Sequence, residues 1–408
     1  MTVSTAPDAQ LEAVAPAGVS RLLAAPHPSY SSHVGTHGVL PQPNRATLLC
    51  ELEASGLGGR GGAAFPTSRK LAAIDPDAAP PIVIGNGAEG EPLSVKDATL
   101  LTRAPHLVID GLLLVAEALN ASETYLAASA RQLASVRTAI AERADAGKII
   151  VHESADSFIS GEASAIVNSV GGGRAIPTDR SLRLTERGLK GRPTLVQNVE
   201  TLAHIALVAR WGGAWYRTVG AADEPGSRLL SITARGRTRV VEATGGIEIA
   251  RALEVAGVDA ADTDAVLVGG YHGAWVPRAQ LGTALSRAAL APFAAAPGAG
   301  ILFALSREQC PLATAAEIAN YLASQSARQC GPCANGLPRM AETLSTLAAG
   351  RADASTEIEV RRMAALVAGR GSCHHPDGTA RFVLSTLETF SSEVARHLNG
   401  QCRLSVSR

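Results

Sequence analysis

The chain has 408 residues, of which 46% are hydrophobic, 18% are charged and only 3% are aromatic. Its 37 Lys and Arg residues equal its 37 Asp and Glu residues in number, so the formal net charge is zero. Because a protein that binds a polyanion normally has a basic excess, nucleic acid is excluded as the main partner. The length predicts two or three domains. No uninterrupted apolar stretch reaches the roughly 20 residues that span a bilayer, so membrane insertion is not expected.

The cysteine content predicts the compartment. Six cysteines are too few for a disulfide scaffold in a chain of 408 residues. Residues 1–18 lack the cationic start and the apolar stretch of a secretory signal. We therefore expect a cytoplasmic protein with reduced thiols, in which clustered cysteines indicate a metal or redox site.

The first part of the chain is expected to be irregular and the second to be an α/β domain. Residues 1–44 mix Pro, Ser, Gly and His without periodicity, and their histidines, His27, His33 and His37, are expected to be solvated. Up to residue 222, strands are predicted to alternate with helices, which favours a parallel sheet. The predicted strands are 81–85, 124–128 and 149–152, and the predicted helices are 45–54, 106–119 and 132–144.

Two further units are predicted in the second half of the chain. Residues 226–306 have a small mixed α+β pattern, with strands over 228–234, 240–243 and 265–268, a tight Arg-Gly turn between the first two, and a helix over 247–255. Residues 310–400 have helical spacing throughout, which predicts a helical bundle. Its expected helices are 313–322, 334–347, 358–367 and 380–398.

A glycine-rich loop, residues 56–62, follows the first predicted helix. Its letters match GxGxxG, but a helix rather than a strand precedes it, so a Rossmann dinucleotide fingerprint is rejected. Glycines still let backbone N–H groups converge on an anion, and Lys70 lies where the next helix can return it to the loop. The loop thus predicts a phosphate or flavin cradle, with an ordinary surface loop as the alternative. Its predicted binding residues are Gly59, Arg60, Gly61 and Gly62.

A polar turn follows the strand predicted over 81–85. Ligands of open α/β sheets bind beyond the carboxyl ends of strands. Asn86 can donate to and accept from a planar heterocycle, and Glu89 and Glu91 can accept from sugar hydroxyls. Taken alone, this segment is better explained as a solvated turn.

Together with later motifs, these two segments resemble the family of NuoF-type flavin-binding subunits of NADH:quinone oxidoreductase (complex I), with relatives in NAD-linked hydrogenases and formate dehydrogenases. The similarity covers roughly residues 45–400 in the family's order. Its further motifs are Lys96-Asp97, Pro105-His106-Leu107, Ser160-Gly161-Glu162 and residues 191–203.

The resemblance implies an architecture and cofactors. The fold class is then multi-domain α/β: a Rossmann-like FMN-binding domain over 45–222, a small β-grasp (SLBB, ubiquitin-like) domain over 226–306 and a helical iron–sulfur domain over 310–400. The glycine loop and Lys70 would face the FMN phosphate and ribityl chain. The residues implied around the flavin are Asn86, Glu89, Gly161, Glu162, Asn198 and Thr201.

The implied activity is electron transfer. FMN accepts a hydride pair and releases single electrons, while the protein supplies position and polarity. Electrons would pass from a reduced donor such as NADH, through FMN, to an iron–sulfur cluster and then to a ferredoxin-like protein or a membrane reductase.

The NAD(H) site departs from the family pattern. Phe65 and Glu91, which the resemblance assigns to NAD(H), are retained. Four positions differ where the family usually has Asp, Glu, Asn and an aromatic residue: Ala88, Ala163, Gln197 and the segment 180–185, which carries Arg180 and Arg183. The FMN frame is therefore predicted to be mostly intact, and the dinucleotide site to be depleted and more electropositive.

Cysteines near the end of the chain indicate a metal centre. Cys330-Gly-Pro-Cys333 places two thiols about one helical turn apart, and Cys373 follows 40 residues later. The family binds [4Fe–4S] through four cysteines, the first of which is Ala327 here. Soft thiolates suit iron–sulfur or zinc. Three residues are candidates for the fourth ligand: His374, His375 and Cys310.

Several alternatives remain open at this centre. They are a three-iron cluster, an external fourth ligand, zinc in a Cys₃His site and complete loss of the metal. A thioredoxin-type redox pair is disfavoured, because a helix is predicted where that motif needs a strand. The protein as a whole would then be a non-catalytic structural paralogue or a zinc-stabilised binding protein. Cys50 and Cys402 are expected to be buried thiols without a role.

Overall fold

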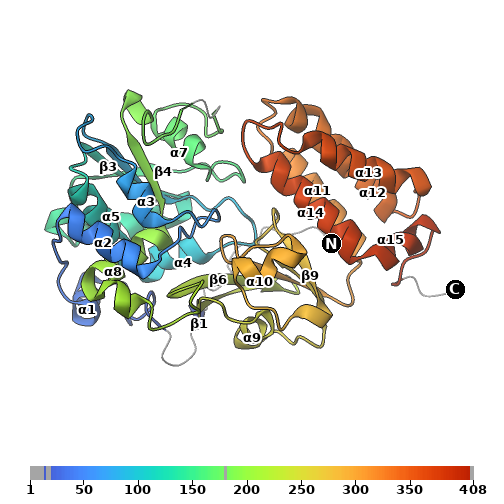
Figure 1. Ribbon diagram of the computed structural model, residues 1–408, viewed down its shortest axis with the longest axis horizontal. Coiled ribbons are helices and arrows are strands. Elements are labelled where there is room, and N and C mark those ends of the chain that lie inside the picture. The colour runs from blue at the N-terminus through green and yellow to red at the C-terminus, as the bar shows by residue number, and fades with distance from the viewer. Residues whose placement is uncertain (1–12, 15–19, 179–181, 405–408) are drawn as a thin grey trace.

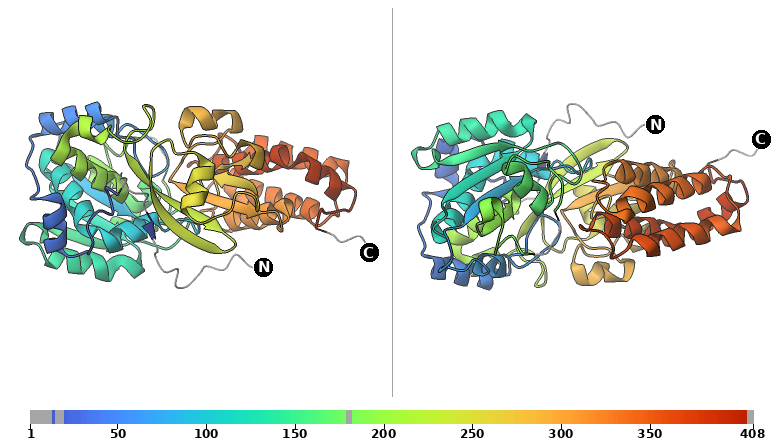
Figure 2. Two further views of the ribbon diagram at one scale, coloured as in Figure 1. Left: turned by 90° about the horizontal axis from the view of Figure 1, so that it is seen from below. Right: turned by 90° about the horizontal axis from the view of Figure 1, so that it is seen from above.

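A computed structural model of the chain describes residues 13–14, 20–178 and 182–404. Figure 1 shows an N-terminal α/β region at one end and the C-terminal helices at the other. The views in Figure 2 place a second sheet region, coloured yellow to orange, between these two parts. Arg180, which belongs to the predicted electropositive segment, lies outside the described residues.

The N-terminal α/β region is built on a four-stranded sheet in the order β4-β3-β2-β5. All three pairings are parallel, as the alternation of strands and helices predicted. The strands are β2 (Ile82–Gly87), β3 (Glu123–Ala128), β4 (Ile149–Glu153) and β5 (Thr194–Asn198). The helices are α2 (Arg45–Ser55), α3 (Thr67–Ala72), α4 (Lys96–Arg103), α5 (Pro105–Ala118), α6 (Leu133–Ala141), α7 (Ala163–Val170) and α8 (Val199–Tyr216).

The largest hydrophobic core lies among these helices and the first sheet. Its closest helix contact is between α5 and α8 at Gly111. A Cβ atom at Gly111 would lie 1.9 Å from the carbonyl oxygen of Leu202, so only glycine allows the two backbones to pack this closely. Because the strands are covered on both sides, β2 is a nearly continuous buried run.

The second sheet has six strands in the order β1-β7-β6-β10-β8-β9. Its central strands β10 and β6 are parallel, and each is flanked by an antiparallel neighbour. The predicted tight turn is present, with positive φ at both Arg235 (47°) and Gly236 (75°). The elements are β1 (Ala13–Val14), β6 (Ser227–Ala234), β7 (Arg237–Thr244), α9 (Ile249–Val255), β8 (Thr263–Val268), β9 (Ala274–Pro277), α10 (Arg287–Leu290) and β10 (Ile301–Ser306).

The C-terminal region contains five α-helices and a π-helical segment, Pro332–Gly336. One long helix was expected over 380–398, but α14 ends before Phe390 and α15 begins after it. Phe390 leaves helical geometry (φ −111°, ψ 33°) and packs edge-on against Trp275, with 5.3 Å between ring centroids. The helices are α11 (Pro311–Ser324), α12 (Leu337–Ala348), α13 (Ala354–Val367), α14 (His375–Thr389) and α15 (Ser391–Leu398).

The expectation of an irregular, solvated N-terminal extension is wrong over residues 30–37. They form helix α1 (Tyr30–His37), which begins after the N-cap Ser29. His33 and His37 are buried, and the Nε2 atom of His33 lies 2.7 Å from a carboxylate oxygen of Asp110 in α5. The sequence of α1 has no apolar stripe, because a buried polar pair holds this helix to the core.

Among the described residues, no single helix is both long enough and apolar enough to span a membrane. The pair α4 and α5 meets the length and composition test together, but the two helices meet at an angle of 94°.

Candidate functional site

The candidate site lies at the carboxyl edge of the first sheet. Asn86 ends β2, and Asn198 ends the neighbouring strand β5 in the same register. Asn86 donates from Nδ2 to the carbonyl of Gly161 (2.9 Å), and its Oδ1 accepts from the Ala88 N–H (3.1 Å). Residues far apart in the chain are therefore brought together, as expected for a ligand site at the end of parallel strands.

The glycine loop packs directly on this edge. A Cβ atom at Gly61 would lie 3.3 Å from the Cβ atom of Asn198. Gly62 has a φ of 107°, which side-chain-bearing residues rarely adopt. The N–H of Arg60 donates to the hydroxyl of Thr201 (2.8 Å). The loop, Asn198 and Thr201 thus form one surface of exposed backbone and small polar groups.

The guanidinium of Arg60 has a structural role instead of the expected anion contact. The side chain is buried, and its Nη2 atom donates to the Tyr216 hydroxyl (3.0 Å) and to the carbonyls of Pro225 and Ser227 (3.2 Å each). These partners lie at the end of α8 and at the start of the second sheet. The sequence indicated the charge of Arg60, but only its long-range partners decide where that charge points.

Lys70 is the buried cation of the site. It lies on α3, and its Nζ atom donates to the carbonyl of Val196 in β5 at 2.5 Å. Burial is the sole cause that lowers the pKa of Lys70, to about 8. A buried ammonium group beside a neutral carbonyl favours binding of an anion. The Lys70 environment therefore fits a phosphate group.

The two carboxylates expected to face the flavin cap helices instead. Glu89 accepts from the N–H groups of Asp97 (3.0 Å) and Ala98 (2.9 Å) at the start of α4. Glu162 accepts from the N–H groups of Ser164 (2.8 Å) and Ala165 (3.2 Å) at the start of α7. Both residues border the site, and each fixes a helix N-terminus there.

A buried charge network lies behind the site. The Lys96 ammonium is 2.6 Å from the Asp97 carboxylate and 3.0 Å from that of Glu200. Burial opposes the charge on Lys96, but the two carboxylates outweigh it and raise the pKa of Lys96. Burial raises the pKa of Asp97 to about 7, although Lys96 opposes this shift. Asp97 in turn accepts from Nδ2 of Asn198 (2.8 Å), so the network orients a predicted site residue.

Sequence reasoning treated this charge network only as a family motif. Glu200 also accepts from the N–H of Leu229 (2.9 Å) in the second sheet. The adjacent Lys96-Asp97 pair at the start of a helix was the available signal. Its partner Glu200 lies more than a hundred residues further along the chain, at the beginning of α8.

The residues assigned to NAD(H) lie on different elements. The Phe65 side chain is 54% exposed, while its carbonyl accepts from the Gly59 N–H (2.9 Å). The Glu91 carboxylate lies 3.3–3.4 Å from the N–H of Tyr271, a residue that follows β8 in the second sheet. Burial raises the pKa of Glu91 to about 8. Glu91 is therefore mostly neutral at pH 7, which suits it poorly as a fixed negative charge.

The three predicted metal-binding cysteines lie near one another in the C-terminal region. Cys333 is 3% exposed and lies in the π-helical segment before α12. Burial raises the pKa of the Cys333 thiol to about 12, with further contributions from Cys330 and Cys373. Helix α11 precedes this segment, where a thioredoxin-type motif would require a strand.

The three candidate fourth ligands differ in position. His375 donates from Nε2 to the carbonyl of Leu322 (2.8 Å), and its Nδ1 lies 3.1 Å from Nε2 of His272. The His374 side chain is 76% exposed, and its Nδ1 lies 3.1 Å from a carboxylate oxygen of Asp377. Cys310 belongs to a different group of side chains, 3.5 Å from His397.

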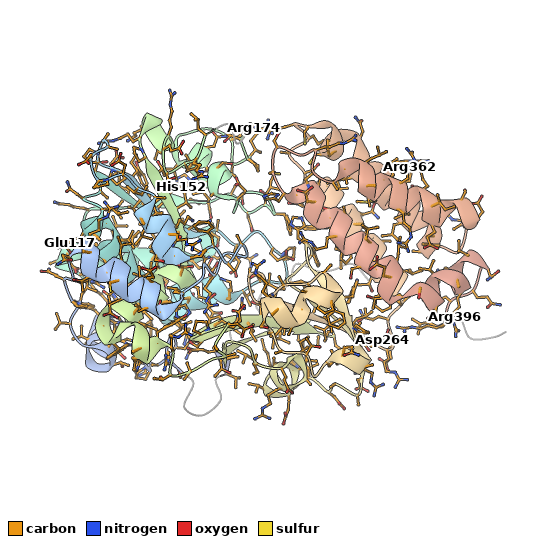
Figure 3. All side chains as sticks on the ribbon, in the orientation of Figure 1. Glu117, His152, Arg174, Asp264, Arg362 and Arg396 are labelled. Atoms are coloured by element: carbon orange, nitrogen blue, oxygen red, sulfur yellow. The ribbon has the colours of Figure 1, made fainter. Side chains whose placement is uncertain are left out.

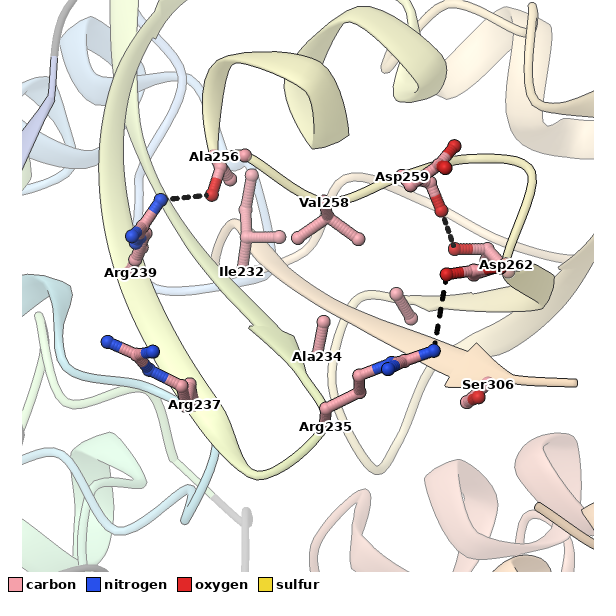
Figure 4. A pocket seen from close by; sticks show the side chains of 13 residues that line it. Ile232, Ala234, Arg235, Arg237, Arg239, Ala256, Val258, Asp259, Asp262 and Ser306 are labelled. Atoms are coloured by element: carbon pink, nitrogen blue, oxygen red, sulfur yellow. Dashed lines mark hydrogen bonds and ion pairs between the residues drawn. The ribbon is translucent and has the colours of Figure 1, made fainter. Parts of the chain in front are cut away.

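A separate pocket lies in the second sheet region, with a volume of about 310 Å³ (Figure 4). Arginines of the β6–β7 hairpin and the carboxylates of Asp259 and Asp262 line it. None of its lining residues belongs to the predicted site.

The fold and the site together define the class of the protein. A parallel α/β sheet carries an anion-binding edge, and a helical region carries three clustered thiols, as in redox proteins that hold a nucleotide cofactor and a metal centre. Residues 52–207 match the Nuo51 FMN-binding domain, and residues 313–397 match the iron–sulfur binding region of NADH-ubiquinone oxidoreductase-F. The chain belongs to the NuoF-type family of flavin-binding subunits, and it has the family's FMN-binding domain and 4Fe–4S binding region.

Its relatives cover most of the chain. The second of the F subunits of NADH-quinone oxidoreductase in Rhizobium meliloti is 28% identical over 369 residues, which are 85% of this chain and 87% of the relative. The corresponding F subunit of Salmonella typhimurium is 26% identical over 389 residues, 90% of this chain and 87% of the relative. A crystal structure of NAD⁺-reducing [NiFe]-hydrogenase in the air-oxidized state superposes with a TM-score of 0.79 at 27% identity over 87% of this chain. This chain spans 63% of the hydrogenase chain.

Proposed function

We propose that this protein binds FMN and transfers electrons from a reduced donor, NADH, to an iron–sulfur cluster and onward to a partner protein. The observation that carries the proposal is the convergence of Gly61, Asn198 and Lys70 at one sheet edge. It combines a close backbone approach with a buried cation beside a neutral carbonyl. The match to an FMN-binding domain over the same residues supports it.

The domain roles follow the boundaries expected from the sequence. Residues 45–222 form the FMN-binding domain. Residues 226–306 form the SLBB-like β-grasp domain, which is supported by a central parallel strand pair with antiparallel neighbours. Residues 310–400 form the helical iron–sulfur domain, which is supported by the family match over 313–397.

The residues that hold FMN are assigned by chemistry. Lys70 and the backbone N–H groups of the glycine loop bind the phosphate. Around the ring system, Asn86 and Asn198 supply amide groups, Thr201 anchors the loop, and Glu89 and Glu162 aim helix N-termini toward the site. Bound FMN supplies the conversion of a hydride pair into single electrons. The full set is Gly59, Arg60 (through its N–H), Gly61, Gly62, Lys70, Asn86, Glu89, Gly161, Glu162, Asn198 and Thr201.

NADH is the proposed donor, and its site differs from the family pattern. The exposed ring of Phe65 offers a stacking surface. Ala88 and Ala163 remove two carboxylates that family members have, and Glu91 is mostly neutral at pH 7. A less acidic site repels the NADH phosphates less but offers fewer acceptors for its ribose hydroxyls. The expected consequence is weakened discrimination between NADH and its phosphorylated analogue.

The cluster is held by Cys330, Cys333 and Cys373, with His374 as the fourth ligand. The carboxylate of Asp377 lies beside Nδ1 of His374, the arrangement by which a carboxylate orients a metal-binding imidazole. His375 and Cys310 have the other partners described above. A partner protein takes electrons from this cluster, and the six free thiols support a reducing, cytoplasmic location.

Anaerobic purification tests the proposal. We expect yellow-brown protein with one FMN per chain and with iron and sulfide, whose flavin absorbance is bleached by NADH in a stopped-flow mixer. Cys330→Ser and Cys373→Ser should lose iron and keep FMN, and His374→Ala should change the electron paramagnetic resonance signal of the cluster. Colourless protein with stoichiometric zinc would support the zinc-stabilised alternative, and colourless protein without metal would support the structural paralogue.

A further inference from the structure

Four metal-ligating side chains meet in the C-terminal region, apart from the three clustered cysteines. The ligand atoms of Cys310, Glu393, His397 and Cys402 all lie within 4.8 Å of one another. Cys310 precedes α11, Glu393 and His397 lie one helical turn apart on α15, and Cys402 follows α15. This end of the molecule carries the labels Asp264 and Arg396 in Figure 3.

We propose that Cys310, Glu393, His397 and Cys402 bind a structural zinc ion. Zinc prefers four ligands from cysteine sulfur, histidine nitrogen and carboxylate oxygen in a tetrahedron. This set supplies two sulfurs, one nitrogen and one oxygen. No family match or resemblance assigns a metal to these positions, and the site is independent of FMN and of the thiols of Cys330, Cys333 and Cys373.

The distances between the ligand atoms agree with a tetrahedral ion. Zinc–sulfur bonds of about 2.3 Å and zinc–nitrogen or zinc–oxygen bonds of about 2.05 Å imply edges of about 3.5 Å between sulfur and nitrogen and about 3.3 Å between nitrogen and oxygen. The structure has 3.5 Å between Cys310 Sγ and His397 Nε2 and 3.3 Å between His397 Nε2 and Glu393 Oε1.

The orientation of His397 also favours a cation. Its Nδ1 lies 3.3 Å from the carbonyl oxygen of Leu347, which can only accept, so Nδ1 carries the hydrogen. In the neutral ring, Nε2 then presents a lone pair toward the Cys310 sulfur and the Glu393 carboxylate. A zinc ion between these groups removes that repulsion, and a backbone carbonyl on the other nitrogen is the usual support of a zinc-binding histidine.

The surroundings stabilise the anionic ligands. The Cys310 sulfur is the N-cap of α11 and accepts from the Ala313 N–H at 3.5 Å. Helix N-termini favour a thiolate over a thiol. Glu393 Oε1 accepts from the N–H of Arg403 at 2.9 Å, and the Arg396 side chain lies 3.8 Å from Glu393 Oε2. These contacts offset the net negative charge of two thiolates and one carboxylate around a divalent ion.

The proposed ion would join both ends of the helical region. Cys310 stands before its first helix and Cys402 after its last, while Glu393 and His397 are 4% and 3% exposed. All four protein ligands close the coordination sphere, which is typical of structural rather than catalytic zinc. The two half-buried cysteines cover the outer side of the site.

Cobalt(II) titration of the double variant Cys330→Ser/Cys373→Ser, which removes two of the three predicted cluster thiols, tests the proposal. We expect one cobalt per chain with the visible bands of a tetrahedral ion and sulfur-to-cobalt charge transfer in the near ultraviolet. Adding Cys402→Ser or His397→Ala should weaken binding by more than about 100-fold, since even supporting residues contribute 10–100-fold. Cys50→Ser, at an exposed thiol on α2, should leave the titration unchanged.

X-ray absorption of the zinc-loaded double variant gives a second readout that does not depend on further substitutions. Two sulfur neighbours near 2.3 Å and two nitrogen or oxygen neighbours would support the site. Absence of zinc and cobalt binding, a sphere without sulfur, or a Cys310–Cys402 disulfide in protein purified with a thiol reductant would each overturn it. A chelator should also lower the melting temperature of the double variant and have no effect once Cys402 is replaced.

Discussion

At the scale of single residues, the candidate site depends on where a few charges are satisfied. The side chain of Arg60 is fully engaged with Tyr216 and with backbone carbonyls at the start of the second sheet. Lys70 is instead buried beside a neutral carbonyl. Of these two cations near the glycine loop, Lys70 is therefore the one whose energy improves when a phosphate arrives, because an anion offsets its desolvation.

FMN affinity should fall as the pH rises through about 8, the pKa of Lys70 without ligand. Below that pH the ammonium is present, and above it the phosphate must bind a neutral amine or recruit a proton. The phosphate itself is already dianionic above pH 7, since its second pKa is about 6. We expect the Kd from flavin fluorescence to be up to about tenfold weaker at pH 9 than at pH 7.

Two controls isolate this effect of Lys70. Lys70→Met should bind FMN weakly with no change between pH 7 and 9, while Lys148→Met, at an exposed lysine of the same domain, should behave as the wild type. Riboflavin, which lacks the phosphate, should bind with an affinity that does not follow the Lys70 titration. A wild-type Kd that stays constant across this range would contradict the assignment.

Replacing Glu91 with Gln should stabilise the protein at alkaline pH. The pKa of Glu91 is raised by burial from 4.5 to about 8, so the folded state keeps a proton that the unfolded chain has released. The stability supplied by this group is thus full below about pH 4.5 and is lost as the pH rises to about 8. Each pKa unit corresponds to about 1.4 kcal/mol. Glu91→Gln should therefore melt at a higher temperature than the wild type at pH 8.5.

The stabilising effect of Glu91→Gln should disappear at pH 5, where the wild-type carboxyl group is mostly protonated in the folded protein. Glu53→Gln, at an exposed position on α2, is the matched control and should show no such pH dependence. An equal shift of the melting temperature at pH 5 and pH 8.5 would show that the carboxyl charge is not the cause.

At the scale of secondary-structure elements, close helix packing holds the N-terminal core together. Helices α5 and α8 meet at Gly111 and Leu202 with no room for a side chain. Helix α8 begins at the candidate site, since Asn198 is its N-cap and accepts from the Glu200 N–H at 3.0 Å. Core packing and site geometry are therefore linked through one helix.

Gly111→Ala should be strongly destabilising. The added methyl group would lie 1.9 Å from the Leu202 carbonyl oxygen, which is backbone and cannot rotate away. We expect a loss of about 3 kcal/mol or more in urea unfolding, at the upper end of overpacking effects. Gly147→Ala is the control, because Gly147 has a φ of −62° and no atom within 4 Å of the added carbon. It should be neutral or slightly stabilising; equal effects of the two variants would refute the packing argument.

At the scale of the whole molecule, a small number of buried polar links join the three regions. Arg60 and Glu200 connect the first region to the second sheet. Trp275 connects that sheet to the helices, because its indole N–H donates to the Thr386 hydroxyl at 3.0 Å and its backbone N–H donates to Ser385 at 2.8 Å. The relative placement of the proposed cofactor sites depends on these links.

Trp275→Phe should loosen the C-terminal helices and leave the FMN-binding region intact. The change removes the indole hydrogen bond, worth about 1 kcal/mol, and leaves a void against Phe390 and Phe382. Hydrogen exchange should rise in α14 and α15, with little change in β2 and β5. Trp211→Phe, at an exposed tryptophan, serves as the control. Uniform exchange increases across the chain would mean that the regions do not unfold separately.

The order of strands and helices, and the edge at which the site forms, were predictable from sequence. Apolar runs and helical periods reflect local burial, and they placed β2, β3, β4 and most helices within a few residues. The carboxyl ends of parallel strands converge by geometry, which brought Asn86 and Asn198 together. Glycine at 61 and 62 likewise follows from local backbone needs.

What only the tertiary structure decided is where individual polar groups find their partners. Glu89 and Glu162 cap helices, His33 pairs with Asp110, and Cys310 and Cys402 meet across the helical region. Local sequence determines whether a residue favours a helix, a strand or a turn. The partner of a buried charge or thiol is a contact between distant parts of the chain, and no local preference encodes it.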